Sequence, residues 1–160
     1  MKVGVDTHGC LVNLGVIHLL CLRYEKSKEY FIKAIEMSPN EYKEYLRLGE
    51  CLFGLGQYKE AQESFTKGLT LLTKIQQVDP NNVQLTLEIS NTKVWTSRCL
   101  KELGDYNASI QILQSVIKHF PEHLDALFHY AVIFYELEKY SDAFNLLLQI
   151  LVKDTRFLFF

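Results

Sequence analysis

Cysteine and histidine are the residues of this 160-residue chain that could bind a metal or act as nucleophiles. The four cysteines, Cys10, Cys21, Cys51 and Cys99, form no CxxC pair of the kind found in zinc sites, and they are too few and too scattered for a disulfide framework. They indicate a reducing compartment, so we expect a cytoplasmic location, or a nuclear one. We expect Cys51 and Cys99 to pack between helices as small apolar residues.

Two histidines, His119 and His123, have the spacing of metal ligands. Pro121 lies between them and interrupts the helix that would bring both imidazoles to one face. The sequence contains no GxxxxGK[ST], GxGxxG, GxSxG or HExxH motif. We therefore expect no metal, no cofactor and no catalytic residues.

The composition excludes two classes of partner. Lys and Arg number 17 against 19 Asp and Glu, which leaves a net charge of -2 and no basic surface for nucleic acid. No uncharged apolar run reaches the roughly 20 residues that a membrane-spanning helix needs. With 48% hydrophobic and 22% charged residues, the chain has the composition of an ordinary folded domain and not of a disordered one.

Four tyrosines begin similar phrases of sequence. They are Tyr24, Tyr58, Tyr106 and Tyr140, and they lie 34, 48 and 34 residues apart. In each phrase a small residue follows after three positions and a large apolar residue after seven, and both offsets return to the same helical face. The small residues are Ser27, Ala61, Ser109 and Ala143, and the large ones are Phe31, Phe65, Leu113 and Leu147. Each phrase is therefore expected to form one amphipathic helix.

A second helical segment precedes each tyrosine. Nine positions before the tyrosine stands a small residue, where we expect the two helices to approach most closely: Gly15, Gly49, Ser97 and Ala131. Pro39 and Pro121 follow two of the phrases and end their helices. The repeating unit is a helix, a short turn and a second helix.

These units resemble tetratricopeptide repeats, which are helix-turn-helix units of about 34 residues. The phrases GLGQYKEAQESFTKGL and ELGDYNASIQILQSV carry the resemblance, which covers nearly the whole chain. It implies an all-α fold, a right-handed α-solenoid of four repeats at about residues 8–41, 42–75, 90–123 and 124–157, within a single domain spanning 8–155. Ser27 and Ser109 depart from the alanine usual in the family. Residues 156–160 form an apolar tail or start a further helix, and they favour a segment of a longer array.

The 48-residue interval between the second and third tyrosines predicts an elongated helical hairpin. Asp79, Pro80, Asn81 and Asn82 stop one helix and start the next, with extensions over about residues 73–89. An extension of about seven residues on each helix keeps nearly the same face toward its partner. The hairpin represents either tolerated length variation or a dedicated docking surface.

The first helices of such repeats line a concave groove that holds partners. We expect the groove to mix aromatic and charged side chains, which suits an extended or helical peptide with acidic and apolar residues. Its residues are Asn13, Lys43, Arg47, Glu50, Phe53, Asn91, Trp95, Arg98, Phe128, His129 and Tyr135, and Val94 falls on the same predicted face.

The function expected from this fold is a non-catalytic adaptor or scaffold in a multiprotein complex. One alternative comes from the resemblance: Asn13, Lys43 and Arg47 match part of the clamp with which tetratricopeptide co-chaperones hold the acidic C-terminal tails of heat-shock chaperones. The remaining lysine and asparagine of that clamp would lie before Met1. A second alternative is a regulatory segment of a larger enzyme.

Overall fold

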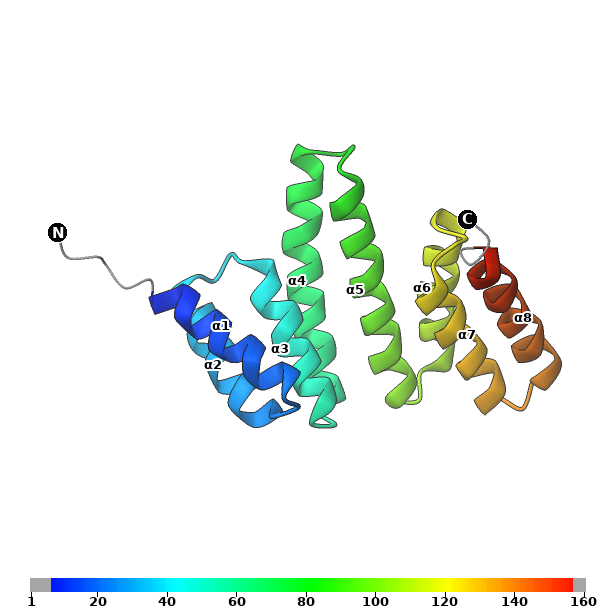
Figure 1. Cartoon of the computed structure of the whole chain (residues 1–160), viewed down its shortest axis with the longest axis horizontal. Helices are drawn as coiled ribbons and strands as arrows, with labels where there is room; N and C mark the ends of the chain where they lie inside the picture. The colour runs from blue at the N-terminus through cyan, green and yellow to red at the C-terminus, as the bar shows by residue number, and fades with distance from the viewer. Residues whose placement is uncertain (1–6, 157–160) are drawn as a thin grey trace. The chain divides into compact units, whose positions relative to one another are not determined.

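The structure is a computed structural model that describes residues 7–156. These residues form eight α-helices and no strand (Figure 1), which confirms the all-α repeat fold. The helices are α1 (Thr7–Leu20), α2 (Tyr24–Met37), α3 (Tyr42–Gly54), α4 (Tyr58–Val78), α5 (Val83–Glu102), α6 (Tyr106–His119), α7 (Leu124–Glu136) and α8 (Tyr140–Arg156). Phe157 to Phe160, the apolar end of the chain, lie outside the described residues.

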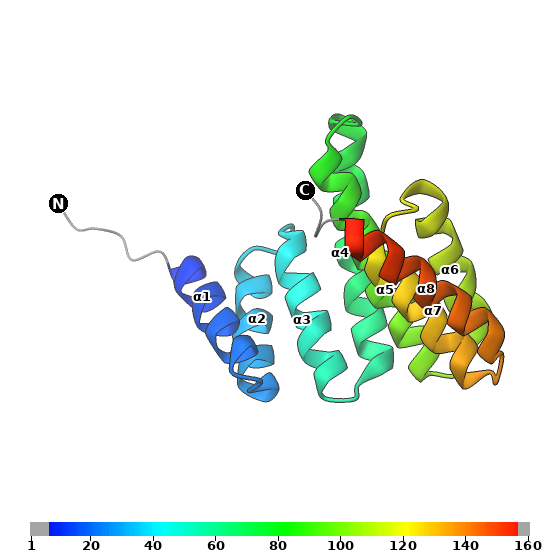
Figure 2. The same ribbon diagram turned by 45° about the vertical axis from the view of Figure 1, so that its right-hand side comes forward.

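The helices fall into two compact units whose boundary lies within α5, between Thr92 and Lys93. In the first unit α1 packs on α2, α2 on α3, and α3 on α4 (Figure 2). In the second unit α6 packs on α7, and α7 on α8. The single domain over residues 8–155 and the right-handed path of the solenoid stay predictions.

The periodic tyrosines mark the start of every second helix in the described chain. Helices α2, α4, α6 and α8 begin at Tyr24, Tyr58, Tyr106 and Tyr140, as the sequence predicts. The small residue three positions later is buried in all four helices. The large residue seven positions later is fully buried in α2, α4 and α6, whereas Leu147 of α8 is 46% exposed.

The small residues of the first helices lie where two helices come closest. A Cβ atom added at Gly49 would stand 2.7 Å from the ring of Phe65, and one at Gly15 would stand 2.9 Å from Phe31. Such distances are too short for any side chain beyond hydrogen, so glycine permits the packing. Ala131, at the same position of α7, is also buried.

The turn before each of the four periodic tyrosines passes through a residue of positive φ, two positions before the tyrosine. The four residues are Leu22, Gly56, Gly104 and Glu138, with φ of 56°, 74°, 83° and 60°. After each, the next backbone N–H bonds a carbonyl five residues back, as from Gln57 to Leu52 at 2.9 Å. This left-handed closure of a helix favours glycine, which two of the four turns have.

The elongated hairpin is confirmed, because α4 has 21 residues and α5 has 20. Asn82 starts α5 by accepting a hydrogen bond from the backbone N–H of Leu85 at 3.1 Å. Gln76 of α4 donates to the hydroxyl of Thr86 on α5 at 3.0 Å, within the first unit. Val78 and Val83 are exposed on either side of the turn.

Each unit has its own buried apolar side chains. In the second unit, Leu113 and Val116 pack with Val94, Ala126 and Ile133, and Ile110, Ile117 and Tyr130 pack against this cluster. Cys51 and Cys99 have no exposed surface, which confirms that both pack between helices, and all four cysteines are free thiols.

Candidate functional site

Four of the predicted groove residues form two pairs in the second unit, one on α5 and one on α7. The guanidinium of Arg98 lies 3.9 Å from the centre of the Trp95 ring. The rings of Phe128 and His129 meet edge to face, with centroids 5.4 Å apart. We call these four residues the aromatic–arginine cluster, and its Phe128 ring is 48% exposed.

The charge of Arg98 reaches His129. Burial, with a smaller effect of the cations Arg98 and Lys101, lowers the pKa of His129 to about 4, although Asp125 opposes the shift. His129 is therefore neutral at pH 7, and its ring can accept or donate a hydrogen bond without carrying charge.

Lys101 borders this cluster and was not among the predicted site residues. Its ammonium lies 2.8 Å from a carboxylate oxygen of Glu102 and 2.8 Å from one of Glu136. Although burial lowers the pKa of Lys101, its hydrogen bonds to the two glutamates outweigh burial and raise it. The contact with Glu136 joins α5 to α7, so Lys101 ties together the two helices that carry the cluster. A spacing of 35 residues offers no local sequence pattern by which to find this pair.

In the first unit the predicted cations have partners of their own. Arg47 donates to both carboxylate oxygens of Glu50, at 3.0 and 3.2 Å. The ammonium of Lys43 lies 5.9 Å from the centre of the Tyr42 ring. The Arg47 pair is exposed and spaced i, i+3 on α3, so it is a weak surface salt bridge that a stronger acidic ligand could displace.

The remaining predicted residues are distributed over both units. Asn13 of α1 and Asn91 of α5 are exposed side chains of the first unit, where the ring of Phe53 packs edge-on against Tyr58 with centroids 5.1 Å apart. Tyr135 of α7 is exposed in the second unit and packs edge-on against Tyr140. The placement of Val94 on the groove face is wrong, because Val94 is buried in the core cluster of the second unit.

The two spaced histidines have separate structural roles. A ring nitrogen of His119 lies 2.7 Å from the carbonyl oxygen of Ser115. His123 caps α7 by accepting from the backbone N–H of Ala126 at 3.3 Å. Among residues 7–156, no group of three or more His, Cys, Asp and Glu side chains could hold a metal ion.

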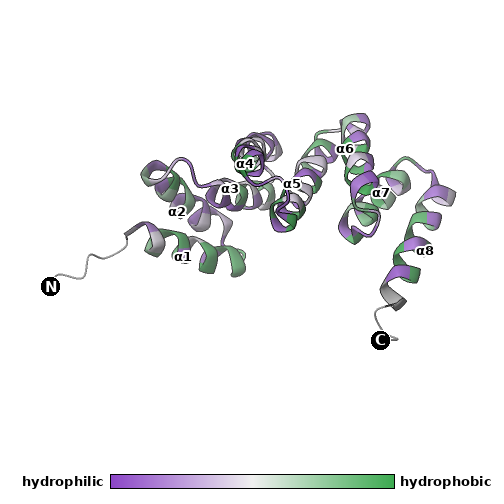
Figure 3. Ribbon diagram, turned by 90° about the horizontal axis from the view of Figure 1, so that it is seen from above, coloured by the Kyte–Doolittle hydropathy of each residue, from purple (hydrophilic) through white to green (hydrophobic). Residues whose placement is uncertain are grey.

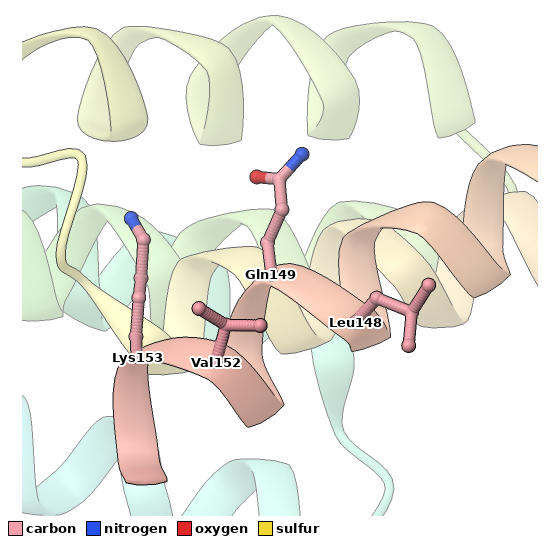
Figure 4. A pocket seen from close by; sticks show the side chains of 4 residues that line it. All are labelled: Leu148, Gln149, Val152 and Lys153. Atoms are coloured by element: carbon pink, nitrogen blue, oxygen red, sulfur yellow. The ribbon is translucent and has the colours of Figure 1, made fainter. Parts of the chain in front are cut away.

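An open pocket of about 420 Å³ lies along α8 (Figure 4). Leu148, Gln149, Val152 and Lys153 line it. Lys153 donates to the carbonyl of Pro121 and lies 3.4 Å from a carboxylate oxygen of Glu122. Because Lys153 is engaged in these contacts, the residues that line the pocket provide an apolar surface and no acid–base pair.

Comparison with known proteins agrees with this architecture. Two tetratricopeptide repeat family models match residues 8–41 and 30–63, and the model for subunit 3 of the anaphase-promoting complex, or cyclosome, matches residues 86–150. A search of curated proteins found no match. No helix in the described part of the chain is both long and apolar enough to cross a membrane.

Solved structures share the fold at low sequence identity. The crystal structure of MamA superposes with a TM-score of 0.75 at 14% identity, over 99% of this chain and 85% of that one. A chain of the APC/C hetero-tetramer Cut9–Hcn1 gives 0.74 at 17% identity, over 91% of this chain but only 27% of that one. The N-terminal domain of stress-induced protein-1 from C. elegans gives 0.58 at 16% identity, over 75% and 89%. The chain therefore contains tetratricopeptide repeats within residues 8–63, and it shares the fold of these solved structures.

Proposed function

We propose that this chain is a non-catalytic protein-binding module, an adaptor or scaffold whose first helices hold a segment of a partner protein. The observation that carries the proposal is the aromatic–arginine cluster on α5 and α7. Aromatic residues and arginine are the residues that most often dominate binding at protein interfaces. The match to a subunit model of the anaphase-promoting complex supports a place in a multiprotein assembly.

The chemistry of the cluster defines the ligand. Stacking on Trp95 fixes the plane of the Arg98 guanidinium, and a fixed guanidinium suits the two oxygens of a carboxylate. On α7, Phe128 adds an exposed apolar ring, and neutral His129, which the charge of Arg98 reaches, adds a hydrogen-bonding group. We therefore expect a peptide segment in which an acidic side chain is flanked by aliphatic or aromatic ones.

Selection of displayed peptides on the full chain, followed by calorimetry, tests this function. Selected peptides should combine an acidic residue with large apolar ones. Their affinity should fall at least about tenfold in Arg98→Glu and in Phe128→Ala, the loss of one good interface contact. Lys118→Glu, which reverses an exposed cation on α6, is the matched control and should bind normally. If no peptide is selected, or if Arg98→Glu and Lys118→Glu bind alike, this site is wrong.

A co-chaperone-like function through Asn13, Lys43 and Arg47 is the alternative, and similarity to the fold of stress-induced protein-1 supports testing it. The Arg47–Glu50 salt bridge weighs against it, because a carboxylate ligand would first have to displace Glu50. An acidic peptide with a free C-terminus should bind more tightly than its amidated form, and Lys43→Ala should remove the difference. Equal binding of both peptides would eliminate the clamp.

We also propose a cytoplasmic or nuclear location, because all four cysteines are free and two are exposed. The second alternative function, a regulatory segment of a larger enzyme, uses the same binding surface. A catalytic domain in the same reading frame would favour this alternative over the adaptor.

A further inference from the structure

Helix α1 is apolar on the side that its neighbours leave uncovered. Residues Thr7–Leu20 include no Asp, Glu, Lys or Arg. Gly15 faces inward against Phe31, while Cys10, Leu14 and Ile17 lie on the opposite side, and Ile17 is 55% exposed. Asn13 is a polar side chain exposed on the same side, but an exposed helix side with this many apolar residues usually packs against another surface. We call Cys10, Leu14 and Ile17 the leading face.

Helix α8 has an uncovered apolar side as well. Figure 3 shows hydrophobic residues recurring along the ribbon of this helix. Phe144, Leu147 and Leu151 are exposed, Leu151 by 59%. Their spacing of three and four residues places them on one side of the helix. We call these three residues the trailing face. Contiguous exposed apolar side chains of this kind mark an interaction surface.

The second unit contains the same two faces already packed together. On α6, the positions 4, 7 and 11 residues after Tyr106 are Ile110, Leu113 and Ile117. The residues of the trailing face stand at the same distances after Tyr140. On α7, the positions 14, 10 and 7 residues before Tyr140 are Ala126, Tyr130 and Ile133. The residues of the leading face stand at the same distances before Tyr24. All six residues belong to, or pack against, one core cluster. The leading and trailing faces are therefore the two halves of a contact that the fold makes internally.

The first unit repeats part of this contact. Cys51, at the position of Ile17, donates from its thiol to the hydroxyl of Ser27 on α2 at 3.1 Å. In both units the second helix of one repeat covers this side of the first helix of the next. A helix that packs on the leading face of α1 should therefore have the residue pattern of the second helix of a repeat.

We infer that copies of this chain associate head to tail, with the trailing face of one copy packed on the leading face of the next. The partner is a second copy because one chain carries both the leading and the trailing face. The residues of these faces have the same spacing from their tyrosines as the residues of the α6–α7 contact within the chain. Neither face includes a charged side chain that the contact would bury unpaired. Because the two faces differ, such a contact does not close on itself and can extend to further copies. This inference does not depend on the proposed peptide-binding function.

Blocking one face at a time tests the inference on the full chain. Ile17→Glu blocks the leading face and Leu151→Glu the trailing face, and both replace exposed side chains. Gln111→Glu adds the same charge at an exposed site of α6 as the control. Circular dichroism checks that each variant folds, and Leu14→Glu and Phe144→Glu are the second pair of blocking variants.

Sedimentation equilibrium should show that the average mass of the wild type and of Gln111→Glu rises with concentration. Each blocking variant alone should stay a monomer. An equimolar mixture of Ile17→Glu and Leu151→Glu should form a pair of two copies and nothing larger, since one free face of each kind remains. A wild type that stays monomeric overturns the inference. So does a Leu151→Glu variant that dimerises alone, because it would pair through α1 with α1.

Discussion

The hydroxyl of Ser27 donates a hydrogen bond of 2.7 Å to the backbone carbonyl of Gly15, and so ties the two helices of the first repeat together. Ser109 makes the equivalent bond to the carbonyl of Ser97 at 2.8 Å. The two serines that depart from the alanine of the resembled family thus have a shared role. They bond the backbone at the point where the paired helices come closest.

Replacement of these serines by alanine should therefore destabilise the chain modestly. Ser27→Ala removes one buried hydrogen bond to a carbonyl and the acceptor of the Cys51 thiol, and alanine fits the site, as Ala61 and Ala143 show. We expect a loss of about 1 kcal/mol in the free energy of unfolding by urea. Ser27→Val, which overfills the same site, should cost more. A Ser27→Ala variant as stable as the wild type would contradict a stabilising bond.

Two of the hairpin turns should tolerate glycine better than their present residues. Leu22 and Glu138 have φ of 56° and 60°, and both side chains are exposed. Leu22→Gly and Glu138→Gly should each raise the free energy of unfolding by up to about 1 kcal/mol, because glycine adopts this conformation without strain. Gly56→Ala and Gly104→Ala should lower it by a similar amount. Thermal unfolding of the four variants would measure both the expected gains and the expected losses of stability. A Glu138→Gly variant less stable than the wild type would refute the idea that these turns favour glycine.

The four thiols should divide into a fast and a slow pair. Burial raises the pKa of Cys99 to about 12 and also raises that of Cys51, so neither forms a reactive thiolate at pH 8. In dilute native protein a thiol reagent should modify Cys10 and Cys21 quickly and the other two only as the chain unfolds. The Cys10→Ser, Cys21→Ser double variant should show only the slow phase. Rapid modification of four thiols would mean that the interior opens easily.

Acid should weaken the second unit through His129. Its folded pKa of about 4 lies below its ordinary value of 6.5, so between these pH values the unfolded chain binds a proton that the folded chain does not. The stability that neutral His129 contributes is fully present above pH 6.5 and is lost progressively as the pH falls toward 4. Urea unfolding at pH 7 and pH 5 should show a smaller difference in His129→Gln than in the wild type. An acidic peptide bound beside Arg98 should raise the pKa of His129 in a proton NMR titration.

Sequence periodicity was sufficient to predict the helices. A fixed offset from each tyrosine predicts which residue faces its partner helix, and this holds for Gly15 and Gly49. The elongated hairpin was predictable because Asp79 and Pro80 both stop a helix and the inserted length is about two turns on each side. These features depend on local chemistry and on spacing, both of which the sequence displays directly.

The details of the candidate site depend on packing and were less accessible. Val94 lies on the predicted groove face by periodicity, yet it is buried in the core cluster around Leu113. The Lys101–Glu136 contact and the lowered pKa of His129 require knowing that α5 and α7 lie against each other. The Arg47–Glu50 pair, in contrast, has the i, i+3 spacing that a search for helical ion pairs would have found.

The turn between α4 and α5 has a practical consequence. Asp79 to Asn81 are exposed, and the helices that flank them are bonded to each other below the turn through Gln76 and Thr86. An epitope tag or a fluorescent label inserted after Asn81 would therefore leave the rest of the first unit undisturbed. Such a labelled protein would allow its partners and its own copies to be followed in living cells.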